Sequence, residues 1–202
     1  MSSKGYEPRE WRFREESPLL FQGSSVLEGL QARTGLERIT LDLCLSRGLE
    51  TPEQIHEFLN PRLEALTPSS RIAGMEAAVA RLIRAKESGE QVRIFGDYDV
   101  DGTTGAALLG WFFREVGISH EIRQPDRFKD GYGLNVGAVE QAVADGAGLM
   151  VTVDCGITSF AAIERARELG LDVIVVDHHQ LDPVKGLPDA LAVINPQRPD
   201  CP

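Results

Sequence analysis

The chain has 202 residues, of which 42% are hydrophobic and 26% are charged, and its net charge is −10. This balance excludes wholesale disorder and a collagen-like repeat, and a chain of this length buries a core without disulfides. No apolar run is long enough to span a membrane, the N-terminus lacks the apolar core of a signal peptide, and three cysteines do not form a secreted framework. We therefore expect a globular cytoplasmic protein with no membrane partner.

The N-terminal part of the chain is predicted to be helical. Residues 1–20 carry charges, glycine and prolines, and we expect a flexible tail there. A small helical region follows over residues 21–90. Within it, Thr51 and Gln54 stand at capping-box spacing with Pro52 in the first turn, which predicts a helix ending near Asn60. Apolar residues at helical spacing over 74–88 predict another helix, which ends at Gly89.

From residue 91 to 202 the pattern changes to an α/β domain. Short apolar strands are expected at 92–95, 118–123, 149–153, 173–176 and 192–194, with helices at 103–116, 136–144 and 158–169. This alternation predicts a parallel sheet. The strands are continuously apolar, so helices should cover both faces. Trp111, Phe112 and Phe113 lie inside one predicted helix and are expected in the core.

Acidic residues follow three of the predicted strands. In chain order, the first strand is followed by Asp97, Asp99 and Asp101, the third by Asp154, and the fourth by Asp177 together with His178 and His179. The carboxyl ends of parallel strands meet at one edge of a sheet, where ligands bind. We therefore expect these side chains to converge in a single crevice. A lone Asp after a strand is commonly a helix cap or a turn residue, but five Asp and two His at three strand ends favour a metal site.

The spacing of these residues indicates which ions the crevice would hold. In extended backbone, alternating Asp97, Asp99 and Asp101 would point the same way, and such concentrated negative charge calls for cations. Two divalent ions about 3.5–4 Å apart would neutralise it. Oxygen ligands with an imidazole are more typical of a Mn²⁺ or Mg²⁺ site than of a zinc site built on thiolates. Adjacent His178 and His179 would diverge in regular extended backbone, so that one can bind metal while the other faces substrate or orients the metal ligands.

A phosphate site is predicted beside the metals. Gly102, Thr103 and Thr104 open a helix, whose free N–H groups and positive dipole favour an anion. Arg127 lies in the glycine-rich loop after the strand predicted at 118–123, and it is a candidate phosphate contact. A metal pair beside a phosphate cradle indicates metal-assisted hydrolysis of a phosphoester or phosphoanhydride.

Four segments resemble the signature motifs of the DHH phosphoesterase superfamily: 96–102, 125–133, 153–156 and 177–179. The segment from Phe58 to Leu66 resembles the bacterial members that degrade single-stranded DNA from the 5′ end. The resemblance implies that two Mn²⁺ or Mg²⁺ ions are bound by Asp99, Asp101, Asp154 and His178, with Asp154 between them. It also implies that Asp97 and Asp177 orient ligands and that His179 contacts the scissile phosphate.

The same resemblance implies a nuclease of DNA repair and recombination. Members of the superfamily carry a further ligating Asp and a second catalytic domain downstream, so we expect an N-terminal fragment with weak or no activity alone. Single-stranded DNA would then be held mainly by the missing domains. Two alternatives remain open: a DHH hydrolase of small substrates such as an oligoribonucleotide, a cyclic dinucleotide or pyrophosphate, or a non-catalytic scaffold. A non-catalytic scaffold is expected to have lost the acidic residues that would bind metal.

Overall fold

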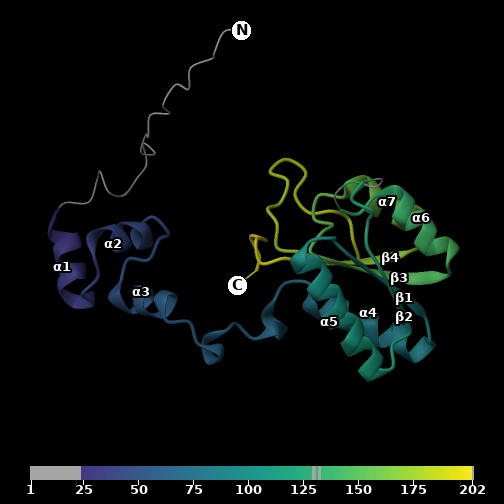
Figure 1. Ribbon diagram of the computed structural model, residues 1–202, viewed down its shortest axis with the longest axis horizontal. Helices are drawn as coiled ribbons and strands as arrows, with labels where there is room; N and C mark the ends of the chain where they lie inside the picture. Colours follow the sequence, from purple (N-terminus) through teal and green to yellow (C-terminus); the bar gives the residue numbers. More distant parts are fainter. Residues whose placement is uncertain (1–23, 129–130, 132, 202) are drawn as a thin grey trace, which may run out of the picture. The chain divides into compact units, whose positions relative to one another are not determined.

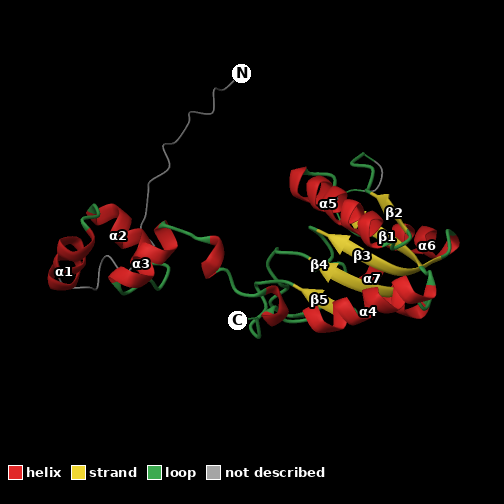
Figure 2. Cartoon of the chain, turned by 90° about the horizontal axis from the view of Figure 1, so that it is seen from below, coloured by secondary structure: helices red, strands yellow, loops and turns green. Residues whose placement is uncertain are grey.

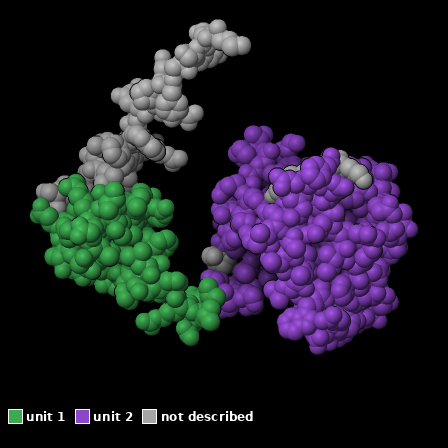
Figure 3. All heavy atoms as spheres, in the orientation of Figure 1, with its two compact units in different colours: residues 1–66 green, residues 67–202 purple. Residues whose placement is uncertain are grey.

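The computed structural model describes residues 24–128, 131 and 133–201. The chain divides into two compact units, one up to Leu66 and one from Thr67 (Figure 3). This division differs from the boundary predicted after residue 90, because helix α4 (Met75–Ser88) buries Ala78 and Ala85 in the core of the second unit. The tail predicted at residues 1–20 lies outside the described residues.

From Ser24 onward, the first unit contains three α-helices, α1 (Ser24–Thr34), α2 (Arg38–Leu45) and α3 (Pro52–Leu59). Their buried residues include Leu27, Leu30, Leu41 and Ile55. The capping box predicted for α3 is confirmed. The Thr51 hydroxyl accepts the Gln54 N–H at 3.2 Å, and Gln54 Oε1 accepts the Thr51 N–H at 3.0 Å.

The second unit is built on a five-stranded parallel sheet, which confirms the predicted fold class. The strands run in the order β2-β1-β3-β4-β5 (Figure 2). Their bounds are β1 (Gln91–Gly96), β2 (His120–Arg123), β3 (Ala147–Val153), β4 (Asp172–Val176) and β5 (Ala192–Ile194).

Helices cover both faces of this sheet, as the apolar strands predicted (Figure 1). Helices α4 and α5 (Val100–Val116) pack on one face, against side chains such as Ile94 and Val151. Helices α6 (Val136–Ala144) and α7 (Phe160–Glu168) pack on the other, against side chains such as Met150 and Val175. Within the described ranges, no helix is both long enough and apolar enough to cross a bilayer.

Helix α5 differs from its prediction in two ways. It begins at Val100 instead of residue 103, because the Asp99 carboxylate caps it by accepting the Gly102 N–H at 3.0 Å. Only Phe113 of the three consecutive aromatic residues is buried, while Trp111 and Phe112 are 56% and 55% exposed. The expectation that all three lie in the core is wrong, because consecutive residues on a helix point in directions about 100° apart.

Candidate metal centre

The three strands with acidic ends finish at the same level of the sheet. The backbone N–H of Asp97 donates to Val153 O at 3.1 Å, and that of Asp154 donates to Val176 O at 2.9 Å. The N–H of Asp177 donates in the same way to Ile194 O at 3.0 Å. Each acid therefore extends its parallel ladder by one residue. The structure brings Asp97, Asp154 and Asp177 into one row across the carboxyl ends of β1, β3 and β4.

This row includes the point where the strand order reverses. From β1 the chain crosses to β2 on one side, and it then returns to place β3 on the other side of β1. The chain leaves β1 toward α5 on one face of the sheet and leaves β3 toward α7 on the other, and parallel α/β sheets bind ligands at such switch points. The order of the strands thus explains why residues more than fifty positions apart, such as Asp97 and Asp154, lie at one site.

Asp154 has a constrained backbone. Its φ is 62°, and among the described residues it is the non-glycine residue with a positive φ. Such a conformation is uncommon for a side-chain-bearing residue and concentrates at functional sites. The residue is buried, and this burial, with the neighbouring Asp99 carboxylate, raises the pKa of Asp154. The N–H of Gly102 holds the pKa of Asp99 below its usual value.

His178 and His179 both lie beside Asp154. One ligand atom from each of the three residues falls within 4.8 Å of the others, and the two rings are 4.7 Å apart at their centroids. The expectation that the histidines diverge is therefore wrong. Regular strand ends at Val176, and Asp177 Oδ1 then accepts the N–H groups of His178 and His179 at 2.7 and 3.1 Å. This turn brings the two rings together.

Asp177 uses both carboxylate oxygens within the protein. Oδ1 also contacts His179 Nδ1 at 2.7 Å, and Oδ2 accepts the Ile157 N–H at 3.0 Å. The contact orients the His179 ring, and it raises the pKa of His179. Asp177 is thus arranged to hold other groups in place, with little capacity left to bind a metal.

Asp97 is in the opposite situation. It is 0% exposed, and neither of its carboxylate oxygens has a hydrogen-bond partner among the described residues. Asp154 Oδ1 also lacks a hydrogen bond, although His178 Nε2 lies 3.0 Å away. A buried carboxylate without a partner is costly unless a cation compensates it. These orphaned oxygens, together with two imidazoles, fit a divalent cation of the Mn²⁺ or Mg²⁺ class.

The remaining predicted metal ligands lie at the start of α5. Asp99 is its N-cap and Asp101 stands in its first turn, so the three acids of this segment do not alternate along extended backbone as predicted. Both side chains are exposed, and Asp101 stands outside the cluster of Asp154, His178 and His179.

The predicted phosphate contacts lie around the same helix end. Gly102 is buried, and a Cβ there would come within 2.4 Å of Asp97 O, so this glycine allows α5 to pack on the Asp97 backbone. The Thr103 hydroxyl accepts Gln124 Nε2 at 2.8 Å, while the Thr104 hydroxyl donates to Val100 O at 2.7 Å.

Arg127 lies on an aromatic ring beyond the carboxyl end of β1. Its guanidinium carbon is 5.5 Å from the centre of the Tyr98 ring. This is a cation–π distance, and it places the positive charge of Arg127 next to the motif that contains Asp97 and Asp99.

Two residues that support the site were missed in the sequence. Gln124 Nε2 donates to Asp97 O at 2.9 Å, and Asn195 Nδ2 donates to His179 O at 2.9 Å. Asn195 carried a signal that could have revealed it, because this polar residue follows strand 192–194 just as the acids follow theirs. Gln124 carried no comparable signal.

Comparisons with known proteins show which family this chain resembles. The family model "DHH family, N-terminal domain" matches residues 91–202. The single-stranded-DNA-specific exonuclease RecJ of Escherichia coli (strain K12) is 42% identical over 160 residues, which cover 79% of this chain and 27% of that protein. RecJ of Bacillus subtilis (strain 168) is 33% identical over 175 residues, which cover 87% of this chain and 22% of that protein.

A solved structure shares the overall fold. The crystal structure of RecJ in complex with Mn²⁺ from Thermus thermophilus superposes with a TM-score of 0.61 at 30% sequence identity. The superposition covers 89% of this chain and 24% of that one. The chain therefore spans about a quarter of the length of these relatives.

Proposed function

The chain belongs to the DHH family, and from this membership we propose that it carries the metal centre of a RecJ-type exonuclease that degrades single-stranded DNA from the 5′ end. The observation that carries the proposal is the cluster of Asp154, His178 and His179 beside the orphaned carboxylate of Asp97. The curated relatives named above, both single-stranded-DNA-specific exonucleases, support the choice of substrate.

Two Mn²⁺ or Mg²⁺ ions would be held by Asp99, Asp101, Asp154 and His178, with Asp154 shared between them. Asp97 would add its buried negative charge to the same crevice. Such ions supply Lewis-acid stabilisation of charge on phosphoryl oxygens and activate the attacking water. The Mn²⁺ in the Thermus thermophilus RecJ structure supports this choice of cation.

His179 has a different proposed role, in contact with the scissile phosphate. The Asp177 carboxylate raises the pKa of His179, so its ring carries a positive charge over a wider pH range than an ordinary histidine. A cationic donor at a fixed position suits the charge that develops on a phosphoryl oxygen.

The start of α5 and Arg127 would contact the DNA backbone next to the metals. Gly102, Thr103 and Thr104 form the first turns of that helix, where positive dipole favours phosphate. The net charge of −10 leaves this chain poorly suited to grip DNA over a long stretch. We therefore assign to this chain the hydrolysis step and a contact with the DNA backbone next to the metals. The whole protein would act in DNA repair and recombination in the cytoplasm.

The experiment combines metal binding with substrate choice. Mn²⁺ titrations of the 202-residue chain should show binding that Asp154→Asn removes. Asparagine tolerates the left-handed backbone at this position, so this variant deletes the charge without adding strain. Any hydrolysis by the chain should be strongest on 5′-labelled single-stranded oligonucleotides and should depend on Mn²⁺.

Two results would contradict the proposal. Preferential hydrolysis of pyrophosphate, an oligoribonucleotide or a cyclic dinucleotide would favour a small-molecule DHH hydrolase. Absence of Mn²⁺ binding would favour a non-catalytic scaffold, although such a scaffold would be expected to lose its acids, and here Asp99, Asp101 and Asp154 are all intact.

A further inference from the structure

Asn195 has a buried side-chain amide at the carboxyl end of β5. It directly follows β5, as Asp97, Asp154 and Asp177 follow their strands, and it is 0% exposed. Burying an amide is costly unless its donor and its acceptor both find partners. An apolar residue would fill the same space at lower cost, so the partners of Asn195 indicate what its polarity is used for.

Both ends of the Asn195 amide are bonded to backbone. Nδ2 donates to the carbonyl oxygen of His179 at 2.9 Å, across a separation of sixteen residues. Oδ1 accepts the N–H of Gln197 at 2.7 Å. Asparagine is suited to this place because a short side chain must both donate and accept; aspartate would lack the donor and leucine would lack both groups.

These bonds fasten a segment that the sheet no longer supports. Pairing between β4 and β5 ends with Val176 opposite Ile194, so the His178–His179 backbone lies beyond the ladder. Asp177 holds this backbone from its N-terminal side by accepting the two histidine N–H groups. Asn195 holds it from the C-terminal side through the His179 carbonyl.

We propose that Asn195 is a positioning residue, which sets the His178–His179 pair for metal and phosphate binding by fixing the His179 carbonyl. This inference rests on the proposed function, because its role is defined by the metal centre. A ligand that is already held loses less conformational freedom when it binds a metal. Groups that orient metal ligands typically contribute about 10- to 100-fold in metal affinity.

The first measurement is a Mn²⁺ titration of the full 202-residue chain by calorimetry. Asn195→Ala should weaken Mn²⁺ binding by about 10- to 100-fold. The matched control is Asn60→Ala, because Asn60 Nδ2 also donates to a histidine carbonyl, His56 O, at 2.9 Å, but in the first unit. Asn60→Ala should leave Mn²⁺ affinity unchanged. Ile163→Val, which trims a buried side chain of α7, controls for lost stability.

The second measurement uses the metal-free protein. Nitrogen-edited NMR of the imidazole rings should show a protected His179 Nδ1–H, bonded to Asp177, in the wild type. This proton should exchange faster in Asn195→Ala. It should also exchange faster in Asn195→Asp, which keeps the acceptor for Gln197 but sets a carboxylate oxygen against the His179 carbonyl. Ile163→Val should leave the signal unchanged.

These outcomes separate the inference from the proposed function. Failure of the wild type to bind Mn²⁺ would defeat the proposed function, while the NMR comparison would still test Asn195. Wild-type protection of the His179 proton in both Asn195 variants would overturn the inference. A loss of Mn²⁺ affinity no larger than that of Ile163→Val would overturn it as well. If Asn195→Ala does not fold, the proton exchange of Asn195→Asp decides the question alone.

Discussion

His179 Nδ1 lies 2.7 Å from Asp177 Oδ1, and the same oxygen accepts the backbone N–H groups of His178 and His179. A single carboxylate oxygen therefore determines both the turn of this segment and the orientation of one ring. The side chain of Asp177 is almost completely buried, while that of His179 is 45% exposed. The pair thus joins the core of the sheet to the solvent-exposed edge at the strand ends.

The first prediction concerns the pH dependence of stability in the metal-free protein. The pKa of His179 is raised above 6.5 in the folded state, mainly by Asp177. The pair should therefore stabilise the fold fully below about pH 6.5, and this contribution should fade as the pH rises through the raised pKa. In EDTA, the difference in unfolding free energy between wild type and His179→Ala should shrink from about pH 5.5 to about pH 9.

The control for this prediction is His56→Ala, which removes an exposed histidine in α3. Its difference from wild type should vary far less over the same pH range, because no carboxylate contacts His56 in the described structure. A His179→Ala difference that is constant, or that grows with pH, would show that the ion pair does not stabilise the fold.

The second prediction is an opposite effect of Asp154→Asn with and without metal. Burial and the Asp99 carboxylate raise the pKa of Asp154, so its negative charge costs the folded state more than the unfolded one. Without metal, Asp154→Asn should therefore raise the melting temperature. With Mn²⁺ at a hundred times the dissociation constant, only the wild type should gain about 2.7 kcal/mol. Thermal unfolding with EDTA and with Mn²⁺ measures both effects.

Asp189→Asn provides the matched control for this charge change. Asp189 is an exposed aspartate, with a side chain 84% accessible, in the loop before β5. This variant should keep the full stabilisation by Mn²⁺. If Mn²⁺ stabilised Asp154→Asn as much as it stabilises the wild type, Asp154 would not be a metal ligand.

Sequence patterns were sufficient to predict the sheet and most helices, because buried parallel strands and capped helices carry local signals. The Thr51–Gln54 capping box is an example, since both of its bonds join residues within three positions. The start of α5 was harder to predict from the sequence. Asp99 belongs to a residue type that serves equally as a helix cap and as a metal ligand, and the alternating acids favoured extended backbone.

The contacts that hold the site in place join residues far apart in the sequence. Asn195 reaches His179 across sixteen residues, and Gln124 reaches Asp97 across twenty-seven. Both contacts exist only because β4 pairs with β5 and β1 pairs with β2. The proximity of the two histidine rings likewise depends on Asp177 turning the chain after Val176, where the sequence predicted extended backbone.

The third prediction compares two glycines inside helices. A Cβ at Gly102 would come within 2.4 Å of Asp97 O, whereas a Cβ at Gly29, in α1, would meet no atom within 4 Å. Gly102→Ala should destabilise the chain by about 1–3 kcal/mol and weaken Mn²⁺ binding, because α5 must move away from Asp97. Gly29→Ala should instead stabilise it by about 0.5–1 kcal/mol. Urea unfolding of both variants gives the comparison, and a neutral Gly102→Ala would refute the close packing at the site.

The last prediction separates the roles of His178 and His179. His178 Nε2 lies 3.0 Å from Asp154 Oδ1, whereas His179 is fixed through Nδ1 by Asp177. If His178 is the metal ligand, His178→Ala should cost about 1–3 kcal/mol of Mn²⁺ binding free energy. His179→Ala should leave Mn²⁺ affinity nearly intact. In a catalytically competent form of the enzyme, it should instead slow the chemical step by about 10²- to 10³-fold, through loss of a donor to the phosphoryl oxygen.

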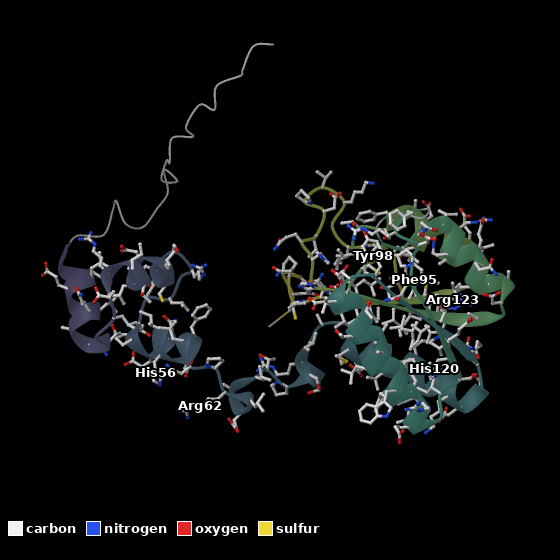
Figure 4. All side chains as sticks on the ribbon, in the orientation of Figure 1. His56, Arg62, Phe95, Tyr98, His120 and Arg123 are labelled. Atoms are coloured by element: carbon white, nitrogen blue, oxygen red, sulfur yellow. The ribbon has the colours of Figure 1, made fainter. Side chains whose placement is uncertain are left out.

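Side-by-side Mn²⁺ titrations of the two variants test this assignment. The closeness of the rings makes the test demanding, because both imidazoles come within reach of an ion beside Asp154. Equal losses of affinity would mean that both histidines bind metal, and a larger loss in His179→Ala would reverse their roles. His120→Ala serves as the control, since His120 stands at the start of β2, at the opposite end of the sheet from the carboxyl edge (Figure 4). Its Mn²⁺ affinity should equal that of the wild type.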